Sequence, residues 1–269
     1  MTRRVAGRAA VLLVVLALVG AACAGDDGPT AGAAERVRAA GPATLEEGTA
    51  RMALRLVLPG PRPTTVAGEG VVDFAGRRGA LNLDYGDLGA MLAAADGPLE
   101  TVLEPAGVFV RVPGLIGPDK PWVKVDLAAL DDVAGVDVGP LGQLQSADPV
   151  QALAFLLGAG EMRKVGEGRL RGTPTTRYRG VLDLAQAAAA APPELGPSVE
   201  AARAALGGQP VPVDIWVDDE GRARKLRLET GSGEGKGTVE MELFDFGAPA
   251  DVVTPPASQV TDLTWLFGG

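Results

Sequence analysis

Apolar and polar residues alternate in short stretches along most of the chain, beginning near Thr49. In the first stretch Met52, Leu54 and Leu56 alternate with charged or small residues. A period of two places successive side chains on opposite faces of a β-strand, so each stretch predicts a strand with one apolar face. The first half of the chain repeats this pattern at residues 66–75, 81–85, 100–104, 108–112 and 122–126.

A helical period replaces the alternation in the middle of the chain. Asp148 is a good N-cap, Pro149 suits the first helical position, and the apolar residues that follow recur three and four positions apart, which predicts a helix over 148–158. A second helix is expected from Asp183 through an alanine run that ends before two prolines. A third is expected over 198–206.

The period of two returns between and after these helices. Strands are predicted at residues 162–170, 175–182, 211–218, 225–229 and 238–246. About ten strands therefore share one apolar face, and three modest helices are available to cover it. Because strongly twisted sheets of this width tend to curl, the predicted fold is α+β, a strongly curved antiparallel sheet (a half-barrel) with helices in its concavity.

The N-terminus has the layout of a secretory signal peptide over residues 1–22. Three arginines precede the apolar run Ala9–Ala22, and Cys23 follows small residues directly. A helix of that length spans only about 21 Å, too short for a hydrocarbon core of about 30 Å. The cysteine after small residues resembles a bacterial lipobox, in which it receives a diacylglycerol and becomes the mature N-terminus. The alternative is an ordinary secreted protein, or an uncleaved anchor, with a stray thiol.

Residues 23–44 are expected to form the lipidated N-terminus and a flexible tether, and residues 45–269 a single domain. The tether is small, polar and acidic, and any helix over 33–40 should end at Gly41-Pro42. Removal of residues 1–22 changes the net charge from −9 to −12. A chain this acidic is not expected to bind nucleic acid or to be drawn to an anionic membrane surface, so membrane attachment must come from acyl chains.

Composition excludes several kinds of chemistry. The chain has no histidine and one cysteine, so Ser-His and Cys-His nucleophiles, zinc sites built on these residues and an internal disulfide are all excluded. No nucleotide-binding motif or EF-hand loop is present, and no cofactor is expected. The pairs Asp131-Asp132 and Asp218-Asp219 are better explained as a solvated loop and a hairpin turn than as catalytic carboxylates or a calcium site.

Several segments, in their order along the chain, resemble the actinobacterial LppX/LprG-type lipoproteins, which are related to the LolA and LolB carriers. Besides Cys23, the segments that carry the resemblance are Thr49–Leu54, Trp122–Asp126, Asp148-Pro149, Gly172–Tyr178, Val181–Leu184, Ile215–Asp218, Arg224–Leu226 and Phe244–Gly247. The resemblance implies a half-barrel around helices with a hydrophobic pocket, binding of an acylated lipid or glycolipid, and no catalytic motif.

Under this resemblance the inward faces of the strands should line the pocket. These positions are Met52, Leu54, Leu56, Val72, Phe74, Leu81, Leu83, Val213, Ile215, Val217, Val239, Met241 and Leu243. At each position ordinary core packing is the competing explanation. Trp122 and Trp216 fall on the polar face, where they would mark a partner surface or cover a loop edge, and Trp265 lies in an apolar tail that would plug the pocket or pack on the sheet edge.

The sequence thus favours a non-enzymatic lipoprotein on the extracytoplasmic face of the cell membrane, anchored through a diacylglycerol on Cys23. It would hold an acylated lipid or glycolipid and pass it through the envelope. The alternative is a structural or sensory lipoprotein with a closed core and no ligand. The sequence identifies no protein partner.

Overall fold

A computed structural model describes residues 32–59, 63–86, 97–105, 107–112, 117, 119–125, 149–230 and 236–262. The predicted signal peptide, Cys23, Asp131-Asp132, Asp148 and Trp265 lie outside these residues. Lipidation, the division into domains and the role of the C-terminal tryptophan therefore stay predictions.

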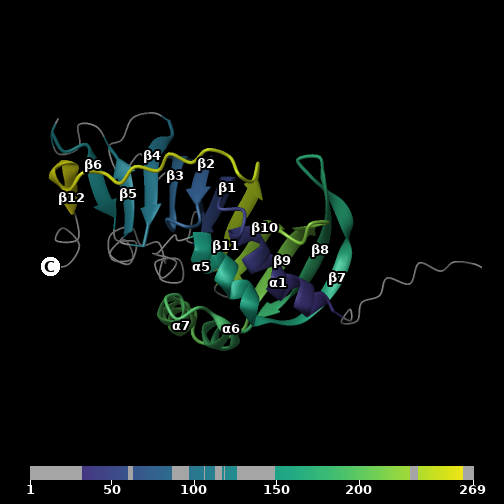
Figure 1. The fold of residues 1–269 in the computed structure, drawn as a ribbon. Coiled ribbons are helices and arrows are strands. Elements are labelled where there is room, and N and C mark those ends of the chain that lie inside the picture. Colours follow the sequence, from purple (N-terminus) through teal and green to yellow (C-terminus); the bar gives the residue numbers. More distant parts are fainter. Residues whose placement is uncertain are drawn as a thin grey trace, which may run out of the picture.

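The described chain is a mixed α+β fold built on one twelve-stranded sheet (Figure 1). The order across the sheet is β12-β6-β5-β4-β3-β2-β1-β11-β10-β9-β8-β7, and every pair is antiparallel except β12 with β6. The strands are β1 (Thr49–Leu58), β2 (Thr64–Asp73), β3 (Arg78–Asp84), β4 (Leu99–Glu104), β5 (Gly107–Arg111), β6 (Trp122–Val125), β7 (Ala159–Leu170), β8 (Thr173–Leu182), β9 (Val211–Asp218), β10 (Ala223–Thr230), β11 (Gly237–Phe244) and β12 (Val260–Asp262).

The helices gather on one side of the sheet (Figure 1), where α1 packs against β7, β9 and β10. They are α1 (Ala33–Leu45), α5 (Pro149–Ala154), α6 (Leu184–Ala190) and α7 (Gly196–Ala205), with 3-10 turns η2 (Phe155–Gly158) and η4 (Ala257–Gln259). The predicted second helix is confirmed, because Asp183 caps α6 by accepting hydrogen bonds from Ala185 N and Gln186 N. The predicted helix over 148–158 is present but tightens into η2 after Ala154.

Helix α1 corrects the prediction of a flexible tether up to residue 44. It runs through Gly41-Pro42, where the sequence predicted its end, and buries Ala33, Val37 and Ala40 in the core. A Cβ on Gly41 would lie 2.6 Å from the Leu153 carbonyl oxygen, so this glycine permits close packing of α1 on α5. Tertiary burial therefore outweighs the local helix-breaking signal, and α1 is part of the folded domain.

The second face of the sheet carries its own apolar cluster, which the sequence did not predict. Val252, in the segment between β11 and η4, packs against Val102, Phe109 and Trp122 on β4, β5 and β6. Thr254 and Glu104 are hydrogen-bonded in the same region. The C-terminal segment then adds β12 to the edge at β6 (Figure 1). Trp122 is therefore buried, and its predicted role in an exposed partner surface is wrong.

Candidate functional site

The inner face of the sheet is one continuous apolar surface. All thirteen positions predicted to line a pocket belong to a single hydrophobic cluster. Ten are buried, and Leu54, Leu56 and Val239 are partly buried against them. The alternation in the sequence therefore assigned these side chains to the correct face, whereas contact with a ligand stays a prediction.

The described helices cover only part of this inner face. Helix α1 packs on β7, on η2 and α5, and less extensively on β10 and β9. Turn η2 packs on β8, and α6 and α7 pack on each other and on η2 and α5. The apolar cluster nevertheless continues across β2–β6 through Leu81, Leu103 and Val110. The apolar face of the sheet is thus wider than the helical layer that the structure describes.

A pair of hydroxyl groups interrupts the apolar surface on the β2–β6 half. Thr101 lies in register between Leu81 on β3 and Val110 on β5 and is fully buried. The Tyr85 hydroxyl lies 2.9 Å from Thr101 Oγ1, which in turn donates to the Leu99 carbonyl oxygen at 3.2 Å. Burial raises the pKa of Tyr85 to about 12. Sequence reasoning missed this pair, and its signal was a polar residue at an inward position of β4.

The outer face of β8–β11 and β1 is a lattice of charged side chains. Asp214 on β9 accepts hydrogen bonds from Arg179 Nε at 2.9 Å, Arg179 Nη2 at 3.0 Å and Arg177 Nε at 3.0 Å. Burial by itself would raise the pKa of Asp214, but the hydrogen bonds from the two arginines outweigh it and hold the pKa below its ordinary value. Farther along the face, Glu240 pairs with Lys225 at 3.1 Å. The lattice joins neighbouring strands through pairs of opposite charge.

Trp216 is part of this lattice. Arg177 and Lys225 lie over its ring, at 4.8 and 5.4 Å from the centroid. The tryptophan is half-buried rather than fully exposed. Trp216 is paired on both sides within β9 and does not lie at a loop edge, so that predicted role is wrong. A role in a partner surface stays a prediction.

The tip of the β7–β8 hairpin reaches across the outer face. Arg171 lies over the Phe244 ring at 3.7 Å and donates to Glu242 at 2.7 Å and to Glu69 at 2.6 Å. Its φ of 46° is in the left-handed region that side chains seldom adopt. These contacts connect the hairpin at one edge of the sheet to β11 and β2 near its centre.

The turn after β9 shows the predicted hairpin chemistry. Asp218 Oδ1 accepts the Arg222 amide at 2.8 Å, and Oδ2 accepts Arg222 Nε at 2.9 Å. Gly221 takes a φ of 84° to close the turn. Asp218 is therefore a structural carboxylate, as the sequence indicated.

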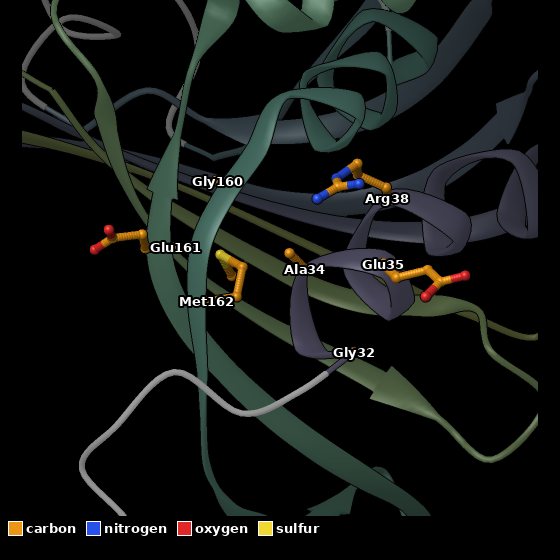
Figure 2. Close-up of a pocket in the computed structure, with 7 residues that line it drawn as sticks. All are labelled: Gly32, Ala34, Glu35, Arg38, Gly160, Glu161 and Met162. Carbon is orange, nitrogen blue, oxygen red and sulfur yellow. The ribbon is translucent and has the colours of Figure 1, made fainter.

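A pocket of about 520 Å³ lies between the start of α1 and the start of β7. Its lining consists of Gly32, Ala34, Glu35, Arg38, Gly160, Glu161 and Met162 (Figure 2). Arg38 Nε donates to the Ala159 carbonyl oxygen at 3.1 Å, and the carboxylates of Glu35 and Glu161 point away from each other (Figure 2). The lining mixes apolar and charged residues and shares no residue with the thirteen predicted positions, and its carboxylates do not converge as a pair that transfers protons would.

Metal sites and membrane-spanning helices are two further features of the described residues that bear on function. No cluster of three or more carboxylate, histidine or cysteine side chains within them could hold a metal ion. None of the helices among them combines the length and apolar character needed to cross a membrane.

Comparison with known proteins places this geometry in a structural context. The crystal structure of the lipoprotein LppX from Mycobacterium tuberculosis superposes with a TM-score of 0.50 and 13% sequence identity, over 83% of this chain and 99% of that chain. The chain has an LppX-like fold. This likeness agrees with the resemblance seen in the sequence, and at this identity it speaks for the fold alone.

Two sequence relatives come from Streptomyces. An uncharacterized 31.2 kDa protein of Streptomyces griseus is 28% identical over 208 residues, covering 72% of this chain and 67% of that protein. A protein of Streptomyces coelicolor named as a candidate lipoprotein is 30% identical over 148 residues, covering 54% of this chain and 44% of that protein. No family model matches the chain.

Proposed function

We propose that this protein is a lipid-anchored carrier that holds an acylated lipid or glycolipid against the inner face of its sheet. In this proposal Cys23 carries a diacylglycerol on the extracytoplasmic side of the membrane. The sheet curves as a half-barrel around the helices, and the β2–β6 half shelters the acyl chains. The protein binds and delivers the lipid and makes no covalent change to it.

One observation supports this proposal most strongly: the apolar inner face extends beyond the described helices. Across β2–β6 the inward side chains Val72, Leu81, Leu83, Leu103 and Val110 are buried in the same hydrophobic cluster that the helices join elsewhere, so an acyl chain would join a buried apolar layer and not an open surface. A layer of this kind suits hydrocarbon chains, because each methylene removed from water contributes about 0.8 kcal/mol. The LppX-like fold and the name of the Streptomyces coelicolor relative support the same proposal.

Mass spectrometry can distinguish the covalent diacylglycerol on Cys23 from a lipid that is bound without a covalent bond. The full-length protein would be produced in an actinobacterial host, purified in detergent and weighed in its native state, then again after extraction with organic solvent. A covalent anchor stays on the protein after extraction, whereas a carried lipid is released and can be identified. Preparations that repeatedly release no lipid would contradict the carrier and favour a structural or sensory lipoprotein with a closed core.

A substitution at the proposed site tests whether the inner face has room for a ligand. Leu83→Trp places a large side chain on the inner face of β3, and Asn82→Trp places the same side chain on the exposed face one residue earlier. With room for a lipid, Leu83→Trp should fold with nearly the wild-type melting temperature and lose most of the extractable lipid, while Asn82→Trp keeps it. In a filled core, Leu83→Trp would instead be overpacked and lose about 1–3 kcal/mol of stability.

A further inference from the structure

The Tyr85–Thr101 hydroxyl pair is an anomaly on the inner face of the sheet. Leu81, Leu99, Leu103 and Val110 surround Thr101 in register or along β4, and each of them is buried and apolar. Tyr85 follows the last residue of β3, and its ring packs on the same hydrophobic cluster while staying partly exposed. A polar group is therefore held at the border of the surface proposed for acyl chains.

The hydrogen bonds within the pair fix the direction of its protons. The Thr101 hydroxyl has one proton, which it donates to the Leu99 carbonyl oxygen. Either hydroxyl could donate in the bond between the two, but only donation by Tyr85 gives both hydroxyl protons an acceptor among the described residues. No described residue donates to Tyr85 Oη, so this oxygen keeps a free acceptor and has no proton left to donate. Because burial raises the pKa of Tyr85 to about 12, the phenol stays neutral at physiological pH.

We propose that Tyr85 Oη accepts a hydrogen bond from a hydroxyl group of the bound lipid. The proposal rests on the carrier function above and specifies its ligand: an acylated lipid that keeps a free hydroxyl close to its acyl chains, as a partly acylated glycerol or a glycolipid does. A lipid whose hydroxyls are all esterified offers only acceptors at this position. It would leave the acceptor lone pairs of Oη unused in an apolar setting, where a hydrogen bond is worth most.

A competition between two nearly identical lipids tests the proposal. The full-length protein would be loaded from an equimolar mixture of 1,2-dioleoyl-sn-glycerol and its 3-acetyl ester, and the ratio of the two complexes measured by native mass spectrometry. The lipids share both acyl chains and differ in one group, a hydroxyl against an acetyl ester. Wild-type protein should prefer the free hydroxyl by about threefold to tenfold, the range expected for one net hydrogen bond.

Three variants identify the oxygen responsible. Tyr85→Phe removes the acceptor and should bring the ratio close to one. Thr101→Val removes the group that takes the Tyr85 proton, so that proton becomes free to bond the acetyl carbonyl, and the ratio should fall below that of Tyr85→Phe. Tyr178→Phe changes the only other tyrosine, which is buried in the same cluster on β8, and should leave the ratio unchanged.

The outcomes separate this inference from the function on which it rests. Equal loading of both lipids by the wild type, or a ratio that Tyr85→Phe does not change, overturns the role of Tyr85 and leaves the carrier function standing. A wild type that loads neither lipid overturns both. Melting temperatures of the variants, measured without lipid, show that each compared protein is folded.

Discussion

At the scale of single residues, Asp214 shows how a buried carboxylate is stabilised on the outer face. Its side chain is only 8% exposed, which disfavours the ionised form, yet hydrogen bonds from Arg179 and Arg177 hold its pKa below the ordinary value. A carboxylate with a lowered pKa in the folded state stabilises the fold above its unfolded pKa of about 3.9. This stabilisation is lost as the pH falls through the folded pKa.

We therefore predict that the cost of Asp214→Asn depends on pH. The variant should have a lower free energy of unfolding than the wild type between pH 5 and 7, and the gap should narrow as the pH falls below about 4. Urea denaturation over this pH range measures the gap. In an Arg177→Gln, Arg179→Gln background only burial acts on Asp214, so the gap at neutral pH should shrink or reverse. If this difference in the free energy of unfolding grew as the pH fell, it would contradict the lowered pKa of Asp214.

At the scale of elements, one buried hydroxyl links the end of α1 to β10. Thr44 is completely buried near the end of the helix, where its Oγ1 donates to the Ala40 carbonyl oxygen at 2.6 Å and accepts the Ala223 amide of β10 at 2.8 Å. Ala223 lies at an irregularity in the pairing of β10 with β9. The threonine therefore satisfies a buried amide at the place where the strand is distorted.

Replacing this threonine should be costly only when the hydroxyl is lost. Thr44→Val keeps the shape of the side chain but leaves the Ala223 amide buried without a partner, and should lower the free energy of unfolding by about 1–3 kcal/mol. Thr44→Ser removes one methyl group and keeps the oxygen, so its cost should stay below about 1 kcal/mol. Chemical denaturation compares the two. Equal losses would mean that packing, and not the hydrogen bond, holds α1 on β10.

The helices and strands show where sequence reasoning succeeds and where it fails. Strands were predictable because an inward residue at every second position is a local pattern, and α6 because its cap and its alanine run are adjacent in sequence. The continuation of α1 through Pro42 was not predictable, because it depends on burial against α5, which is more than a hundred residues away in the sequence. Strand β12 likewise exists through its pairing with β6, which no local pattern indicates.

At the scale of the whole molecule, the candidate site also contains some features that the sequence pattern predicts and others that it does not. The alternation assigned thirteen inner-face residues to one cluster because a sheet with one buried face leaves little choice of register. It could not indicate that Thr101 and Tyr85 meet, since Tyr85 follows β3 and is not opposite Thr101 in the register of β3 with β4. Nor could it indicate that Val252 returns to bury Trp122 on the opposite face. Local patterns assign a residue to a face, whereas tertiary contacts decide what covers it.

The position of α1 also limits how the molecule can stand on a membrane. Eight residues separate Cys23 from Gly32, so a lipid on Cys23 would hold the start of α1 within about 30 Å of the bilayer even with the connection fully extended. Helix α1 packs against edge strand β7, whereas η4 and β12 lie at the opposite edge of the sheet (Figure 1). The two edges should therefore lie at different heights above the membrane.

Energy transfer from a fluorophore on the protein to labelled lipid headgroups measures this difference. Glu35→Cys and Ser258→Cys each introduce one thiol at an exposed position, near α1 and near β12 respectively. A lipidated Cys23 cannot react with the fluorophore, so the unsubstituted protein serves as a control and should remain unlabelled. In phosphatidylcholine vesicles, transfer should be stronger from position 35 than from position 258, because the acidic body has no electrostatic reason to lie flat on the surface. Equal transfer from both positions would mean that the body lies along the membrane, and labelling of the unsubstituted protein would mean that Cys23 carries no lipid.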